Sequence, residues 1–289
     1  MLNNFKKKIV LGTVSLGTKY GVTNFSKKKN ENQQIKILEF AWKNNIRTFD
    51  TAPGYNTEKI LGKLVKKNNL EKEISIFTKI PHFDFDRSWN ERVKKSIESS
   101  FSNCSTNNID IFFFHQPKDI KDVLKKQKFL DDLKKIFPIK KFGFSIYNLN
   151  EYNDLKNDNF FDCIQIPYSI ANREFEEVII KNKNKKFHVR SIFLQGILLS
   201  KKSNILLKDK MLKKTQIYYH NFIKKDNISP TDLSMSFVSR NKKIKSIIIG
   251  VDTLIQLKEL LNFEDKHSKY NFDNLTSIFK NCNLDPRKW

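Results

Sequence analysis

The chain has 289 residues, of which 39% are hydrophobic, and its 25 phenylalanines are enough to fill a sizeable core. No apolar run approaches the ~18 residues that a membrane-spanning helix needs, which excludes a helical membrane protein. The start, MLNNFKKKIVLG, lacks the apolar stretch of a signal peptide, and the cysteines Cys104, Cys163 and Cys282 stand alone without a C-x-x-C pair. We therefore expect a cytoplasmic protein with reduced cysteines and no metal site.

The formal net charge is +23, which is typical either of a protein with an anionic partner or of a solvated, lysine-rich surface. Basic clusters such as FKKK, SKKKN and KNKNKK recur along the whole chain, whereas a nucleic-acid site would gather them on one element. We therefore favour a solvated surface and a small-molecule partner, with no nucleic acid and no membrane bound. The sequence does not indicate an oligomeric state.

Short apolar runs typical of buried strands alternate with amphipathic, helix-like stretches at a steady spacing. The strand-like runs are residues 7–13, 46–52, 73–80, 109–116, 140–146, 161–168, 186–193 and 244–251. The helix-like stretches are residues 31–45, 58–67, 89–101, 122–137, 174–182, 229–240 and 254–263. The stretch 229–240 has a clear start, because Ser229 can cap it, Pro230 suits its first turn and Asp232 can complete a capping box.

Eight repeated strand–helix units without a Pro-, Gly- or Ser-rich linker predict one α/β domain over residues 1–289, a closed parallel (β/α)₈ TIM barrel. The alternative is an open, doubly wound sheet. The spacing of Gly12, Gly17 and Gly21 does not match G-x-G-x-x-G, and no phosphate-binding P-loop motif occurs. We therefore favour the barrel. Within it, the run of phenylalanines at 112–114 indicates a strand buried on both faces.

Polar residues close several of the predicted strands, at the end of a barrel where chemistry takes place. Asp50 ends the second strand with Tyr55 just beyond it, Lys79 ends the third, and His115 ends the fourth. Later strands carry further polar residues at Ser145, Gln165 and Arg190. Each has a plain alternative: Asp50 as a helix cap, Lys79 as a solvated strand end, His115 as a structural histidine. Four such residues on adjacent strands favour a functional site.

These four side chains also make chemical sense together. A phenol has a pKa near 10, so it donates a proton poorly unless a nearby cation lowers that value. A lysine beside Tyr55 would lower it, an aspartate would hold the lysine charged, and a neutral histidine would hydrogen-bond a carbonyl oxygen. Such a set forms a general acid for an oxygen that becomes negative, as the reduction of a carbonyl by hydride requires.

The segments VLGT, TFDTAPGYNTEKILG, IFTK, IDIFFFHQP, GFSIYN, IQIPY and FLQG resemble, in their order, the aldo-keto reductases along nearly the whole chain. The pattern FDTA-x-x-Y-x-x-E-x-x-LG is highly specific. The resemblance implies a (β/α)₈ barrel, a nicotinamide cofactor bound without a Rossmann domain, and a cytoplasmic reductase. It also implies that Asp50, Tyr55, Lys79 and His115 form the catalytic tetrad, with Tyr55 as the acid.

The resemblance implies cofactor contacts as well, either with NADP or with NAD. The matching positions are Gly12, Thr13, Ser145, Gln165, Arg190, Gly250, Asp252 and Gln256. Ser145 and Gln165 match the pair that holds the carboxamide. Arg190 stands where many members have a tyrosine stacked on the nicotinamide, and a guanidinium plane can stack there instead. Asp252 stands where many members clamp the 2′-phosphate of NADP with a cation, so NAD becomes possible; the alternative is that Asp252 caps the last helix.

Weaker features concern the substrate. The segments IQIPYSI and RSIFLQGILL and the end LDPRKW look like bacterial aldo-keto reductases of surface-polysaccharide or nonulosonate pathways, whose substrates are often anionic. We expect the C-terminal tail over the barrel mouth, with Tyr20, Arg287 and Trp289 as substrate contacts. The main interpretation is an NAD(P)H-dependent reductase of an aldehyde or ketone, for example a sugar derivative. The alternatives are an NAD-dependent sugar dehydrogenase and a low-turnover redox-sensing or regulatory protein.

Overall fold

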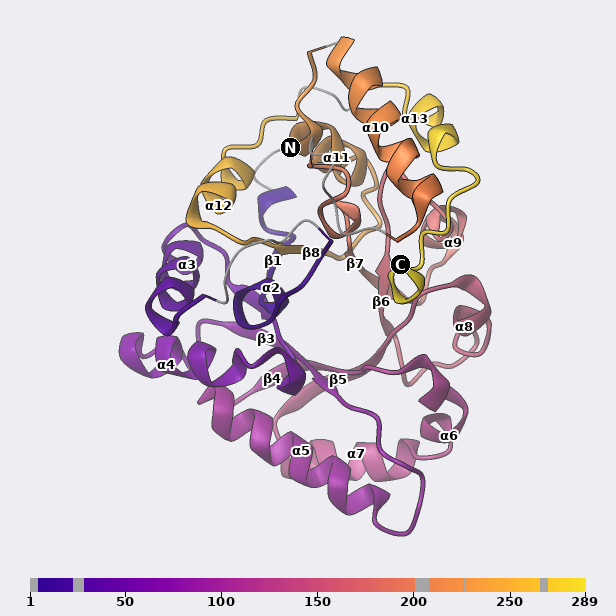
Figure 1. Ribbon diagram of the computed structural model, residues 1–289. Coiled ribbons are helices and arrows are strands. Elements are labelled where there is room, and N and C mark those ends of the chain that lie inside the picture. The colour runs from indigo at the N-terminus through magenta and orange to yellow at the C-terminus, as the bar shows by residue number, and fades with distance from the viewer. Residues whose placement is uncertain (1–4, 23–28, 201–207, 226, 266–269) are drawn as a thin grey trace.

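Eight parallel strands close into a barrel in the order β1 to β8 in the computed structural model, which describes residues 5–22, 29–200, 208–225, 227–265 and 270–289 (Figure 1). The strands are β1 (Ile9–Gly12), β2 (Thr48–Asp50), β3 (Ser75–Ile80), β4 (Ile109–Phe114), β5 (Ile139–Ser145), β6 (Cys163–Pro167), β7 (Lys186–Arg190) and β8 (Ser246–Gly250). This confirms the predicted (β/α)₈ barrel and excludes the open sheet.

Helices surround the barrel. They are α2 (Val14–Gly17), α3 (Glu31–Lys43), α4 (Glu58–Asn68), α5 (Trp89–Cys104), α6 (Ile120–Leu124), α7 (Gln127–Ile136), α8 (Leu149–Asn153), α9 (Glu176–Lys181), α10 (Lys210–Lys225), α11 (Pro230–Ser239), α12 (Leu254–Leu261) and α13 (Asp273–Ile278). Four short 3₁₀ turns are also described: η1 (Pro53–Tyr55), η2 (Pro117–Asp119), η3 (Leu194–Gly196) and η4 (Pro286–Lys288). The sequence analysis did not predict α2, α8, α10 or α13.

Two expectations about helices can be compared directly. The helix start at Ser229 is confirmed, since its side chain accepts a hydrogen bond from the N–H of Asp232 and Pro230 opens α11. The prediction of a single helix over residues 122–137 is wrong, because α6 and α7 are two separate helices. Between them, the N–H groups of Lys125 and Lys126 bond to carbonyls three residues back instead of four, which interrupts the helix.

Side chains inside the barrel form two layers. The lower layer is apolar and consists of Val10, Phe77, Ile111, Phe113, Cys163 and Ile248. Side chains alternate along a strand, so the residue two positions further on also points inward. That second residue is Lys79 on β3, His115 just after β4 and Gln165 on β6. The strand pattern therefore stacks a polar layer directly on an apolar one.

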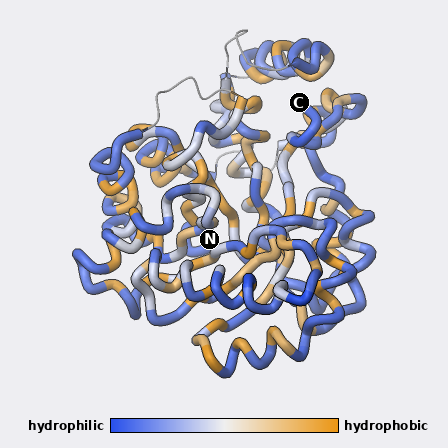
Figure 2. The backbone as a smooth tube through the Cα atoms, turned by 60° about the horizontal axis from the view of Figure 1, so that its bottom comes forward, coloured by the Kyte–Doolittle hydropathy of each residue, from blue (hydrophilic) through white to orange (hydrophobic). Residues whose placement is uncertain are grey.

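The strands themselves lie between this interior and the helices. Figure 2 shows orange, hydrophobic stretches inside the molecule, with blue and orange alternating along the coiled segments around them. Phe112 and Phe114 belong to the outer core between strands and helices, whereas Phe113 belongs to the apolar layer inside the barrel. The prediction of a strand buried on both faces is therefore confirmed.

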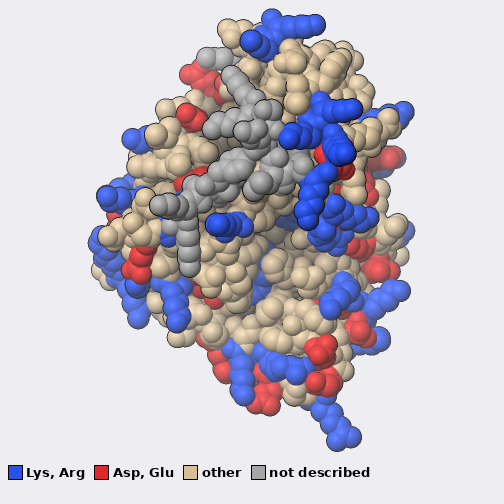
Figure 3. Space-filling view, viewed as in Figure 1, with Lys and Arg blue, Asp and Glu red and all other residues tan. Residues whose placement is uncertain are grey.

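The surface carries the basic charge. Figure 3 shows Lys and Arg side chains around the whole rim of the visible face, with acidic side chains among them. Some are paired across neighbouring helices, as Lys63 is with Glu31 and Lys67 with Glu39. Within the residues described, no helix combines the length and the apolar character that crossing a membrane demands.

Helices α4 and α5 approach each other closely at Gly62, where a Cβ atom would lie 2.1 Å from the carbonyl oxygen of Asn103. We expect Gly62→Ala to lower the free energy of unfolding by about 1–3 kcal/mol, because the two backbones must move apart. Urea unfolding followed by circular dichroism measures this.

Gly54→Ala is the matched control, since a Cβ atom at Gly54 meets nothing within 4 Å. Equal unfolding midpoints for the two variants would show that α4 and α5 do not depend on this contact.

Candidate active site

A buried ion pair joins the ends of β2 and β3. The ammonium of Lys79 donates to Asp50 Oδ1 at 2.7 Å and to the carbonyl oxygen of Thr51 at 2.9 Å. The other carboxylate oxygen, Oδ2, accepts a hydrogen bond of 2.8 Å from the side-chain amide of Gln165 on β6. Ser145 at the end of β5 donates to that same amide group at 3.3 Å. Four strands therefore converge on one carboxylate.

The environment of this pair decides its charge. Lys79 is only 1% exposed and Asp50 only 4% exposed. Burial lowers the pKa of Lys79 below its ordinary value, and the Asp50 carboxylate offsets only part of that shift. Buried charges are tolerated when they are paired and their remaining atoms are hydrogen-bonded, and both conditions hold here.

A threonine cluster fixes the turn that follows β2. The hydroxyl of Thr57 lies 2.7 Å from that of Thr13 and 3.0 Å from that of Thr51. Thr13 also donates through its N–H and its hydroxyl to the carbonyl oxygen of Asp50. The next turn is η1, which is followed by Asn56 in the left-handed conformation, one that asparagine tolerates well. The chain therefore leaves β2 along a defined path.

Tyr55 is the last residue of η1 and is held there by α2. A Cβ atom on Gly17 would lie 2.0 Å from the carbonyl oxygen of Tyr55, so only glycine permits this contact. The tyrosine ring lies 4.9 Å from the Lys79 ammonium and 6.0 Å, centre to centre, from the imidazole of His115. The structure thus brings together all four residues that the sequence analysis singled out.

The charge state of Tyr55 differs from the expectation. Burial and the Asp50 carboxylate raise the pKa of the phenol well above its ordinary value, while Arg190 acts in the opposite direction. The expected lowering by Lys79 does not prevail, because burial, the largest cause, and the Asp50 carboxylate both raise the pKa of the phenol. The phenol consequently keeps its proton at neutral pH.

His115 follows β4, and its backbone N–H donates to the carbonyl oxygen of Ile80. Burial, together with the cations Lys79 and Arg190, lowers the pKa of its imidazole to about 3. The imidazole is therefore neutral at physiological pH, and a neutral imidazole offers one N–H donor.

A cavity of about 470 Å³ opens above these residues, a size within the range of small-molecule and cofactor sites. Both Asp50 and Tyr55 line it, as do the substrate candidate Tyr20 and the following predicted cofactor contacts: Gly12, Gln165, Arg190, Gly250, Asp252 and Gln256. Two other predicted cofactor contacts, Thr13 and Ser145, are buried behind the cavity wall, where they bond to Asp50 and Gln165.

The loop after β8 forms one end of this cavity. Asp252 pairs with Lys29 at 3.4 Å, and the Lys29 ammonium also donates to the carbonyl oxygen of Ser15 at 2.8 Å. Helix α12 is capped by Thr253, whose side chain forms a reciprocal capping box with Gln256. The alternative that Asp252 caps this helix is therefore wrong.

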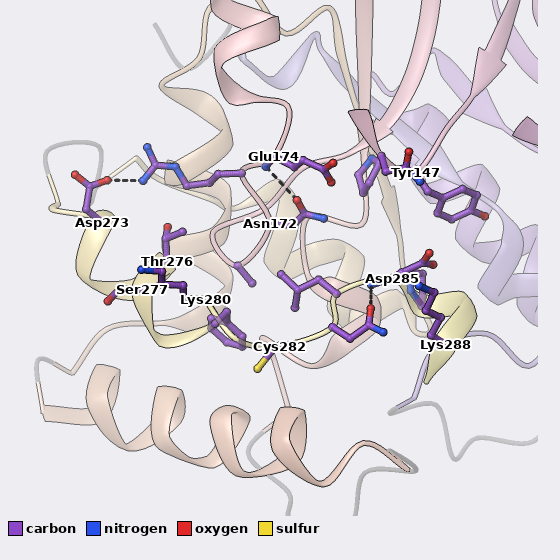
Figure 4. A pocket seen from close by; sticks show the side chains of 18 residues that line it. Tyr147, Asn172, Glu174, Asp273, Thr276, Ser277, Lys280, Cys282, Asp285 and Lys288 are labelled. Carbon is purple, nitrogen blue, oxygen red and sulfur yellow. Dashed lines mark hydrogen bonds and ion pairs between the residues drawn. The ribbon is translucent and has the colours of Figure 1, made fainter. Parts of the chain in front are cut away.

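The C-terminal tail lies beside the cavity and does not line it. Arg287 packs on the ring of Tyr147 at 4.0 Å and pairs with Asp285 and Glu151. Trp289 donates to the carbonyl oxygen of Asn283 and borders a small pocket of its own. Figure 4 shows the open groove next to the tail, which Tyr147, Asp285 and Lys288 help to line. Of the three proposed substrate contacts, only Tyr20 faces the cavity.

Some residues at the site escaped the sequence analysis. Tyr147 lies under the guanidinium of Arg190 at 4.3 Å, and no sequence motif marks it. The loop after β7 holds Ser191, Leu194 and Gln195 at positive φ, a strained conformation for residues other than glycine. Ser191 and Gln195 line the cavity. The sequence analysis quoted this segment, RSIFLQGILL, only for its resemblance and did not predict the loop conformation.

In the HFDFD segment, residues 82–86, histidine and aspartate side chains alternate as they can in a set of metal ligands. His82 lies 2.7 Å from Asp119 and 3.4 Å from Asp84, while Asp86 pairs with Arg92. Across the described part of the chain, no group of three or more His, Cys, Asp or Glu side chains is arranged to hold a metal ion.

Comparison with known proteins identifies the family. The profile of the Aldo/keto reductase family matches residues 8–279. Aldo-keto reductase YhdN of Bacillus subtilis (strain 168) is 25% identical over 182 residues, which are 60% of this chain and 53% of YhdN. The aligned part thus spans about half the length of this curated relative.

Solved structures share the fold. The holo form of aldo-keto reductase AKR11C1 from Bacillus halodurans superposes with a TM-score of 0.68 at 20% identity, covering 88% of this chain and 85% of its own. The aldo-keto reductase MGS-M4 from a Medee basin deep-sea metagenome superposes with a TM-score of 0.65 at 18% identity, covering 96% and 91%. The chain is a (β/α)₈ barrel with a cavity at its mouth. It belongs to the aldo/keto reductase family.

The neutral state of His115 can be tested by NMR. We expect its imidazole signals to keep neutral positions from about pH 5 to 8, because its pKa lies near 3. The unfolded chain binds this proton near pH ~6.5, so His115 contributes stability above that pH that is lost as the pH falls toward its folded pKa.

The His115→Gln variant assigns the signal and should flatten the acid side of the stability profile. A titration midpoint for His115 between about pH 5 and 8 would contradict the neutral state.

Proposed function

We propose that this chain is an NAD(P)H-dependent reductase of aldehydes or ketones in which Tyr55 donates the proton. The single observation that carries the proposal is the position of Tyr55: it lines the cavity, 4.9 Å from the ammonium of the buried Lys79–Asp50 pair and next to His115. A protonated phenol at the wall of a cavity, backed by a fixed cation, is a general acid held ready for one oxygen atom.

The roles of the side chains follow from their protonation. Tyr55 keeps its proton at neutral pH and transfers it from Oη to the carbonyl oxygen as that oxygen becomes an alkoxide, a stronger base than phenolate. Neutral His115 donates a hydrogen bond to the same oxygen and orients it. Lys79 stabilises the phenolate that remains, and Asp50 keeps Lys79 charged and fixed.

A nicotinamide cofactor fits the cavity above the tetrad, where a reduced nicotinamide would supply the hydride. Gly12 and Gly250 are opposite each other on β1 and β8 and both line the cavity, so bare backbone forms this wall. A side chain at either glycine would narrow the space. We propose that these glycines lie against the cofactor and that Gln165 and Ser145 hold its carboxamide.

We further propose that NAD(H) is bound at least as well as NADP(H). At the β8–α12 end, Asp252 and Glu259 line the cavity, and within the described residues no lysine or arginine lines this end. Lys29 is buried behind Asp252, with its ammonium engaged by Asp252 and Ser15. A carboxylate repels a 2′-phosphate and accepts a hydrogen bond from a ribose hydroxyl.

The substrate class and location complete the proposal. The resemblance of the segments around Ile166 and Ile192 to enzymes of bacterial surface-sugar pathways makes a sugar derivative the first class to assay. The three cysteines are free, in keeping with the proposed cytoplasmic location.

Replacing the proposed acid tests the mechanism. We expect Tyr55→Phe to bind the nicotinamide cofactor with unchanged affinity and to lose at least ~100-fold in kcat, because general acid catalysis contributes about 10²–10⁴-fold. Steady-state kinetics with a panel of aldehydes measure kcat, and fluorescence titration with the cofactor measures its affinity.

Tyr218→Phe, on the exposed side of α10, is the control and should behave as the wild type. Unchanged turnover in Tyr55→Phe would refute the mechanism. Wild-type turnover below ~0.01 per second, against ~10 per second for a typical enzyme, would instead favour a low-turnover regulatory protein.

Cofactor choice is measured by fluorescence titration with NADH and NADPH at fixed salt. We expect NADH to bind at least as tightly as NADPH, and Asp252→Asn to shift the ratio toward NADPH by about tenfold, equivalent to ~1.4 kcal/mol.

Glu91→Gln removes an exposed carboxylate on α5 and should leave the ratio unchanged. Tenfold tighter binding of NADPH than of NADH by the wild type would show that Asp252 does not select the cofactor through the ribose hydroxyl.

A further inference from the structure

Arg190 is the cation that faces the proposed reaction centre. It ends β7 and lines the same cavity as Tyr55. Its charge opposes the raised pKa of Tyr55 and contributes to the lowered pKa values of His115 and Lys79. Arg190 therefore shares this cavity with Tyr55 and acts electrostatically on three of the four residues of the site.

The hydrogen bonds of Arg190 leave its charge uncompensated. Its Nη2 donates to the carbonyl oxygen of Ile146 at 3.0 Å and its Nη1 to the hydroxyl of Ser191 at 3.4 Å, both of which are neutral acceptors. Among the residues that the structure describes, no carboxylate pairs with Arg190. Two other arginines that also lack a carboxylate partner in this part of the chain, Arg47 and Arg87, are exposed to solvent. The remaining arginines each have a carboxylate partner: Arg92, Arg173, Arg240 and Arg287. A guanidinium has five donors, so donors remain.

The guanidinium is also held in place. Its central carbon lies 4.3 Å from the ring centre of Tyr147, and that ring is packed in turn by Arg287 of the tail at 4.0 Å. The backbone N–H of Tyr147 donates to the carboxylate of Glu151, which also pairs with Arg287. Tyr147 and Arg287 are therefore positioning residues for Arg190. Arg287 forms ion pairs with Asp285 and Glu151, whereas Arg190 has no carboxylate partner among the described residues.

We propose that the substrate carries an oxyanion, a carboxylate or a phosphate, that binds Arg190 while the carbonyl oxygen binds Tyr55 and His115. This inference rests on the reduction proposed above. A planar guanidinium fixed by stacking matches a carboxylate or phosphate with two parallel hydrogen bonds, and a substrate held at both ends has its carbonyl oriented for reaction. Specificity for charge then resides at the end of β7.

The test measures kcat/KM for two matched pairs of aldehydes at a saturating concentration of cofactor. One pair is succinic semialdehyde and butanal, and the other is glyceraldehyde 3-phosphate and glyceraldehyde. We expect the wild type to prefer the anionic member of one pair at least ~10-fold in kcat/KM, mainly through KM. The pair that shows the preference identifies the oxyanion.

Variants assign the preference to Arg190. Arg190→Gln should lose at least ~10-fold in kcat/KM for the anionic member and less than ~3-fold for the neutral one. Arg190→Lys should recover part of the preference, since it restores the charge without the planar fork. Lys288→Gln is the control. It removes a cation of the tail that lines the neighbouring groove and not the cavity, so it should leave the preference unchanged.

Three results would overturn the inference. The first is equal kcat/KM within both pairs for an active wild type, which leaves the proposed function standing. The second is an equal loss for charged and neutral aldehydes in Arg190→Gln. The third is a tenfold loss of NADH affinity in that variant with the preference intact, which would assign Arg190 to the cofactor.

If the wild type reduces none of the four aldehydes, the proposed function fails for these probes, and calorimetry with succinate and with inorganic phosphate decides the anion site separately. Binding of either anion by the wild type and its loss in Arg190→Gln supports the site. No binding of either anion overturns it.

Discussion

The buried ion pair between Asp50 and Lys79 is the interaction on which the whole site depends. A single carboxylate at the end of β2 receives the ammonium of β3 and, through Gln165, reaches β6 and β5. A buried pair of this kind adds little net stability compared with apolar packing, and breaking it leaves an uncompensated charge. Its role is therefore to fix geometry: it sets the position of a cation behind Tyr55 and ties four strands together at the barrel mouth.

The sequence predicted the barrel and the tetrad because both are written in local patterns. Repeated apolar runs identify eight parallel strands, and parallel strands in a barrel bring their carboxyl ends to one face. Asp50, Lys79 and His115 therefore had to be neighbours once the strands were recognised. Tyr55 could be added because the short connection after β2 leaves it little choice of position.

Contacts between distant segments could not be predicted in this way. Lys29 precedes α3 and yet meets Asp252, which is 223 residues away. Tyr147 and Arg287 meet because the tail returns to the end of β5, and no periodicity encodes that return. The pKa of Tyr55 was missed for a related reason, since its direction depends on the depth of burial and on Asp50 as well as on the nearest lysine.

The apolar layer beneath the site has a consequence for proton supply. Phe77 and Phe113 fill the barrel directly below the polar layer, and His188 packs edge-on against both rings. Burial lowers the pKa of His188 to about 3, so its imidazole is neutral at physiological pH. This layer separates Tyr55 from the opposite end of the barrel, and Tyr55 lines the cavity at the mouth. In the proposed mechanism, Tyr55 is then reprotonated from the mouth, through the space that a bound ligand fills. Each turnover would accordingly use one stored proton, and replacing it requires that the mouth open to water.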